Sequence, residues 1–157
     1  MNWQKEFTNN KLLKDKISDF LDIHGVSGLE QALQLYTDMH QEYLIKNKSS
    51  ISKIKINDIY YLDIQGHDII LHTASGLYKK YGTLNEELET LGRYGFIKCS
   101  QSCMISLSKI KTIHNNEITL TNDDTVHMSK RFAPKVLLAY SVGSNTRKFA
   151  KERHISG

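Results

Sequence analysis

The spacing of apolar residues changes near residue 50 and divides the chain into a helical and a mostly β part. Within residues 10–45, apolar side chains recur every three or four positions, as on one face of an amphipathic helix. Asn10 is a suitable helix cap and Gly25 a suitable stop, so the pattern predicts two short helices, the second continuing through Tyr43. The polar stretch 46–50 has the composition of a linker. We therefore expect a domain boundary near residue 50.

From Ile51 onward the apolar residues alternate with polar ones or form short runs, which is typical of β-strands. Glycine, asparagine and aspartate separate these runs, and the pair Asn115-Asn116 is a turn signal between two of them. The pattern predicts strands within residues 51–62, 69–73, 77–81, 96–99, 104–107, 110–113, 118–120 and 126–128.

Two helices are expected within this β region. Thr83 and Glu86 have capping-box spacing, leucines follow at helical intervals, and Gly92 closes the segment. The polar face of this helix carries Glu86, Glu87 and Glu89, so we expect this acidic side to point away from any nucleic acid. A second helix is predicted from about 130 to 140, with Pro134 tolerated in its first turn. The predicted fold class is therefore a mostly β domain with one inserted and one C-terminal helix, preceded by a short helical extension.

Charged residues are unevenly distributed along the chain. Lys and Arg number 6 against 7 Asp and Glu in residues 1–50, 11 against 9 in 51–140, and 4 against 1 in 141–157. We therefore divide the chain into a helical extension (1–48), a β domain (51–140) and a basic tail (141–157). A basic excess favours a polyanionic partner through phosphate contacts.

Several classes of protein are disfavoured by the sequence. The longest apolar runs fall far below the roughly 20 residues of a membrane span, and the N-terminus lacks a signal-peptide pattern, so we expect a cytoplasmic protein. Cys99 and Cys103 have no further ligands at zinc-site spacing, and we expect no metal or other cofactor. Scattered histidines and cysteines carry no catalytic motif, so we expect no enzyme.

Four segments in order resemble the LytTR family of DNA-binding domains. The similarity covers about 90 residues, and strands and one helix separate the segments as they do in the family. It implies a compact, mostly β fold whose loops enter successive major grooves of double-stranded DNA, as in transcription regulators. The four segments are IYYLDIQGH (59–67), YGTLNEELE (81–89), GFIKCSQS (95–102) and MSKR (128–131).

The resemblance assigns three recognition loops to this chain. Arginine can bind guanine O6 and N7, glutamine can bridge adenine N6 and N7, and lysine and serine suit phosphate oxygens. The first loop contains one candidate, the second contains four including the lysine before it, and the third contains three. These candidate DNA-binding residues are His67, Lys98, Ser100, Gln101, Ser102, Ser129, Lys130 and Arg131.

Departures from the family pattern leave an alternative open. Many members have a histidine and a basic residue where this chain has Ser100 and Gln101, and often an asparagine where it has Ser106. The 50 N-terminal residues are also too few for the family's frequent receiver domain of about 120 residues. The alternative is a protein-interaction module that sequesters a regulatory partner without binding DNA. In either case we expect the N-terminal helices to mediate a homodimer or contact another protein.

Cys99 lies beside the second loop, which motivates a redox hypothesis. In one extended strand, Cys99 and Cys103 would be about 13 Å apart, too far for a disulfide. An intramolecular bond therefore needs a turn between them, and oxidation of one thiol is the other route.

Overall fold

The computed structural model describes residues 2–142, and the predicted basic tail lies outside the described residues from 143 onward. The chain divides into two compact units, one ending at Thr37 and the other beginning at Asp38. Within residues 2–142, no helix is both long enough and apolar enough to cross a membrane.

The N-terminal unit is helical, as predicted. Asn10 caps the long helix by accepting a hydrogen bond from the Leu13 amide at 3.0 Å. Gly25 interrupts that helix with a φ of 73°, a left-handed conformation that glycine adopts without steric cost. The expected break at Gly25 is therefore confirmed, although the helical region begins earlier than expected. The unit contains α1 (Trp3–Thr8) and most of α2 (Lys11–Met39).

The prediction that the second helix continues through Tyr43 is wrong. Helix α2 ends at Met39, and Tyr43 lies in strand β1 (Glu42–Lys46), which pairs antiparallel with β2 (Ile51–Lys55). The polar stretch read as a linker is the turn of this hairpin, closed by a 3.0 Å hydrogen bond from the Asn47 amide to the Ser50 carbonyl. The compact unit therefore starts about a dozen residues before the predicted boundary.

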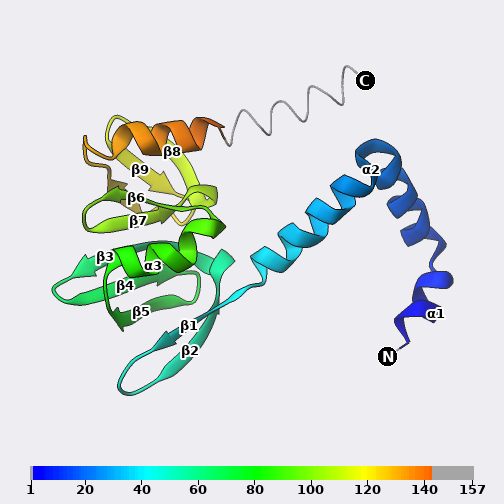
Figure 1. The fold of residues 1–157 in the computed structure, drawn as a ribbon, viewed down its shortest axis with the longest axis horizontal. Helices are drawn as coiled ribbons and strands as arrows, with labels where there is room; N and C mark the ends of the chain where they lie inside the picture. The colour runs from blue at the N-terminus through cyan, green and yellow to red at the C-terminus, as the bar shows by residue number, and fades with distance from the viewer. Residues whose placement is uncertain (1, 143–157) are drawn as a thin grey trace. The chain divides into compact units, whose positions relative to one another are not determined.

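A five-stranded antiparallel sheet forms the centre of the second unit (Figure 1). Its order is β5-β4-β3-β7-β6, so the consecutive strands β3, β4 and β5 and the β6–β7 hairpin are joined through the pairing of β3 with β7. Helix α3 (Leu84–Leu91) lies between β5 and β6 in sequence and packs its leucines onto the sheet's buried side chains. The strands are β3 (Ile59–Gln65), β4 (Asp68–Thr73), β5 (Gly76–Tyr81), β6 (Phe96–Ser100) and β7 (Cys103–Ser106).

A smaller antiparallel sheet of order β10-β9-β8 follows along the chain. Asn115, with a φ of 56°, sits in the tight turn between β8 and β9, where the sequence predicted one. A helix over residues 133–142 then contributes Val136 to the core beneath this sheet. The strands are β8 (Ile110–His114), β9 (Glu117–Leu120) and β10 (Thr125–His127).

Two clusters of buried side chains stabilise these layers. One joins the β1–β2 hairpin, α3 and the five-stranded sheet, and the other joins both sheets and the C-terminal helix. The Tyr61 hydroxyl in β3 donates to Asp124 at 3.2 Å and so links the two sheets. Burial raises the pKa of Tyr61, which therefore remains a donor. The predicted mostly β fold with an inserted and a C-terminal helix is confirmed.

Helix α3 forms as predicted, but one residue of its predicted acidic face is buried. Thr83 caps it by accepting from the Glu86 amide at 3.2 Å. Glu87, however, is only 4% exposed, because Lys80 of β5 reaches it with an ion pair of 2.8 Å. Burial raises the pKa of Glu87 to about 7. One of the three acidic residues therefore faces the core instead of solvent.

Candidate nucleic-acid interface

Three polar segments lie along one side of the second unit. They are the β3–β4 turn at 66–67, the β6–β7 turn at 101–102 and the segment 128–132 before the C-terminal helix, all on the left in Figure 1. The Ile64 amide donates to the Ser102 carbonyl at 3.0 Å, and the Ser129 amide donates to the Cys99 carbonyl at 2.9 Å. The sheet therefore brings together segments that are more than 60 residues apart in the sequence.

The first segment presents His67 to solvent. Residues 66 and 67 form the two-residue turn of the β3–β4 hairpin, and Gly66 has the positive φ of 67° that this turn needs. The strand register pairs Gln65 with Asp68, which limits the turn to two residues. His67 is thus held at the tip of a short hairpin.

The second segment is organised by hydrogen bonds among its own residues. The Lys98 ammonium donates to Gln101 Oε1 at 3.2 Å and to Asn85 Oδ1 of α3 at 3.4 Å. The Ser102 amide donates to Ser100 Oγ at 3.3 Å. Gln101 and Ser102 are exposed, whereas Lys98 and Ser100 are half-buried. Because Lys98 donates to the side-chain oxygen of Gln101, the side-chain amide nitrogen of Gln101 is left to donate outward.

The third segment exposes two cations. Lys130 and Arg131 are exposed and Ser129 is half-buried at the start of the turn that leads into the helix. The carbonyl of Ser129 accepts from the amides of Phe132 at 3.1 Å and Ala133 at 3.0 Å. The segment is therefore anchored through its backbone while both charged side chains remain at the surface.

Phe132 connects the second and third segments, a role that the sequence analysis missed. The Lys98 ammonium lies 5.5 Å from the centre of its ring, and the Arg131 guanidinium carbon lies 5.7 Å from it. Both are cation–π contacts. Its apolar position after the basic pair was visible in the sequence, but its proximity to Lys98 depends on the fold, in which the Ser129 amide donates to the Cys99 carbonyl next to Lys98.

Cys99 and Cys103 face one another across the second segment. Both are buried free thiols, and the Cys99 thiol donates to the Cys103 carbonyl at 3.6 Å. The turn at 101–102 supplies the reversal that an intramolecular disulfide would require. The hydrogen bond with Cys99, together with burial, raises the pKa of the Cys103 thiol. The redox hypothesis stays a prediction.

The eight candidate residues offer hydrogen-bond donors and positive charge, and none of the eight is acidic. The donors suit base edges and phosphate oxygens, the acceptors of a DNA duplex. Among residues 2–142, no cluster of His, Cys, Asp and Glu has the arrangement of a metal site.

Comparisons with known proteins agree with the observed fold. The family model described as the LytTr DNA-binding domain matches residues 49–140. Among solved structures, the chain is similar to the LytTr DNA-binding domain of a Bacillus cereus protein described as a methyl-accepting/DNA response regulator, with a TM-score of 0.56 and 18% identity. The likeness covers 61% of this chain and 95% of that domain, and at this identity it concerns the fold alone. No curated protein matches the chain.

Proposed function

Because the chain belongs to the LytTR family of DNA-binding domains, we propose that it is a bacterial transcription regulator that reads a specific duplex sequence through its three exposed segments. The observation that carries the proposal is the alignment of these segments along one side, joined by the hydrogen bonds between Ile64 and Ser102 and between Ser129 and Cys99. In this proposal the segments insert into major grooves, and the protein acts in the cytoplasm without catalysis.

The roles of the eight residues follow from their chemistry and exposure. Arg131 is the one guanidinium among them and suits a bidentate contact to guanine. Gln101, oriented by Lys98, suits an adenine. His67, Lys130 and the three serines are assigned to phosphate or sugar contacts, which position the protein without reading sequence.

Alanine substitutions at two neighbouring residues test these roles. Arg131→Ala should lose about 1–3 kcal/mol of discrimination between a selected and a scrambled duplex. Lys130→Ala should weaken binding to both duplexes alike and reduce the salt slope by about one unit. Both variants are titrated at several salt concentrations after circular dichroism has verified folding. A folded Arg131→Ala variant with undiminished preference for the selected duplex would refute the assignment of the third segment.

We further propose that the N-terminal unit makes the protein a homodimer. No residue of α1 or α2 is buried, yet α2 exposes large apolar side chains on both sides of Gly25. Leu33 is 61% exposed and Tyr36 is 64% exposed. Apolar side chains exposed on an amphipathic helix are stabilised by burial against another surface, and a second copy of the chain would supply one. A twofold dimer would present two DNA-binding units to repeated half-sites.

Sedimentation of the full chain tests the dimer. Leu33→Glu should shift the protein to monomers, whereas Gln31→Glu, which adds the same charge at another exposed position on α2, should leave it dimeric. If the unaltered chain sediments as a monomer while binding DNA, the helices have another partner. If it is monomeric and binds no duplex, the protein instead sequesters a regulatory partner through these helices.

A further inference from the structure

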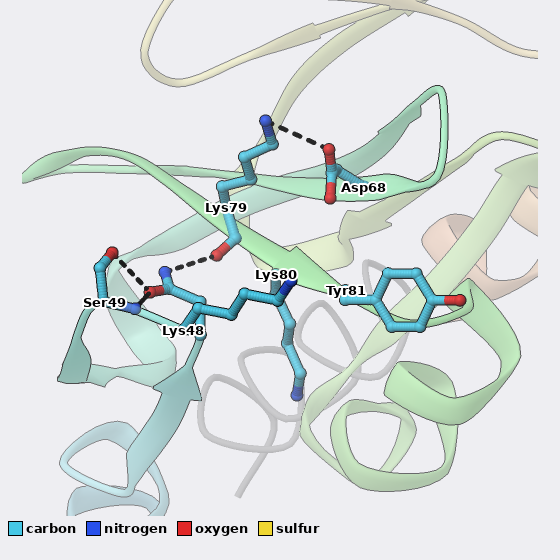
Figure 2. Close-up of a pocket in the computed structure, with 7 residues that line it drawn as sticks. Lys48, Ser49, Asp68, Lys79, Lys80 and Tyr81 are labelled. Carbon is cyan, nitrogen blue, oxygen red and sulfur yellow. Dashed lines mark hydrogen bonds and ion pairs between the residues drawn. The ribbon is translucent and has the colours of Figure 1, made fainter.

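A pocket of about 680 Å³ lies between the turn of the β1–β2 hairpin and the edge strand β5 (Figure 2). It belongs to none of the three segments assigned above. Its walls combine lysines with an exposed tyrosine and small polar groups. The lining residues are Asn47, Lys48, Ser49, Asp68, Lys79, Lys80 and Tyr81.

Asn47 makes this pocket a fixed feature of the fold. Its side-chain oxygen accepts from the amides of Ser49 at 3.1 Å and Ser50 at 2.9 Å, which closes the hairpin turn. Its side-chain nitrogen donates to the Lys79 carbonyl at 3.3 Å, which attaches the turn to β5. The hairpin turn and the edge strand are therefore held in one arrangement before any ligand binds.

The three lysines of the pocket differ in what they contact. Lys79 pairs with Asp68 at 3.1 Å, and its side chain leaves β5 on the opposite face from that of Lys80 (Figure 2). Lys80 forms an ion pair with Glu87 at 2.8 Å. Lys80 also donates to the Tyr43 hydroxyl at 3.2 Å. Lys48, at the tip of the hairpin turn, has no ion pair in the described structure. The uncompensated charge of the pocket is therefore that of Lys48, beside the exposed ring of Tyr81.

The pocket continues the row of DNA-facing segments. Tyr81 pairs with Asp68, the residue that follows His67, so the end of β5 lies next to the β3–β4 turn. Asp68 also lines the pocket, so the pocket begins beside that turn. Lys48 also precedes the residues that the family model matches.

We infer that this pocket binds a backbone phosphate of the DNA that flanks the recognised sequence, with Lys48 as its cation. The inference rests on the proposed function, since the three segments must place the duplex first. The contact adds affinity and sets the register of the protein on the duplex, but it reads no base.

Binding to duplexes of different length tests the inference. The selected site is extended in steps of two base pairs on either side, and affinities of the full chain and of Lys48→Gln are measured from 50 to 200 mM salt. One lost phosphate contact lowers the salt slope by about 0.9, so the advantage of the unaltered chain should shrink roughly threefold across this range. The difference should appear only on duplexes that carry the flank. Lys55→Gln is the matched control, because it removes an exposed lysine at the far end of the same hairpin.

Each outcome decides the inference. Equal salt slopes for Lys48→Gln and the unaltered chain on every duplex, with preference for the selected site intact, would overturn it and leave the proposed function standing. Absence of any preference by the unaltered chain would overturn both. In a second arm, inorganic phosphate is titrated while the amide signals of residues 48–49 and 79–81 are followed by NMR. Saturation by phosphate without any dependence on flank length would assign the pocket to a free anion instead of DNA.

Discussion

Replacing Phe132 by leucine tests how the second and third segments are held together. Leucine keeps an apolar side chain at this half-buried position but removes the ring that both Lys98 and Arg131 contact, at 5.5 and 5.7 Å. An exposed cation–π contact contributes about 0.5–1 kcal/mol, so the two together contribute about 1–2 kcal/mol to positioning the cations. At tenfold per 1.4 kcal/mol, affinity for the selected duplex should fall roughly five- to thirtyfold.

Fluorescence anisotropy with labelled selected and scrambled duplexes measures this effect. The loss should be larger on the selected duplex, because Arg131 is the proposed base-reading residue. Phe132→Tyr keeps the aromatic ring and should bind like the unaltered chain, which separates the loss of the ring from a general change at this site. If Phe132→Leu is folded and binds the selected duplex equally well or more tightly, the ring does not position the two cations for DNA.

Three further predictions concern stability, each measured by urea unfolding. Tyr61→Phe removes the hydrogen bond to Asp124 that joins the two sheets and should lower the free energy of unfolding by about 1 kcal/mol; an unchanged midpoint would contradict this role. Because burial raises the pKa of Glu87 to about 7, the folded state binds more protons than the unfolded state, and stability should decrease as the pH rises from about 5 to 7. Glu87→Gln should remove that part of the pH dependence, and an identical dependence in the variant would exclude Glu87 as its source. Gly95→Ala should cost about 1 kcal/mol, because Gly95 has a φ of 85° with open space around its Cα, so backbone strain is the only penalty; a smaller loss would mean that the loop relaxes.

Local patterns in the sequence predicted most of the β domain. Thr83 and the leucines after it are sufficient to define α3, because capping and helical spacing are properties of neighbouring residues. The turn at Asn115 could also be predicted from local sequence, since asparagine tolerates the left-handed conformation.

The errors arose where distant residues decide the structure. Tyr43 fits a helical stripe that continues from Tyr36, but pairing with Ile51–Lys55 makes residues 42–46 a strand, in which burial alternates although the sequence does not. Glu87 lies among other acidic residues of α3 and was assigned to the solvent face. Its burial depends on Lys80, which approaches from a neighbouring strand.

The candidate site shows the same division between local and distant information. The family resemblance located the three polar segments, and the fold places them on one side. Phe132 could not be assigned from sequence, because its contact with Lys98 spans 34 positions and requires the segment 128–132 to lie against β6.

The most direct test of the central claim is the affinity of the full chain for duplex DNA selected from random sequences, compared with a scrambled duplex of equal length across a range of salt concentrations. A LytTR-type regulator that reads sequence should prefer the selected duplex by about a thousandfold or more, and its affinity should fall linearly in a plot of log affinity against log salt. Selection that enriches no common sequence, together with equal and weak affinity for both duplexes, would contradict the proposal that this protein is a sequence-specific DNA-binding regulator.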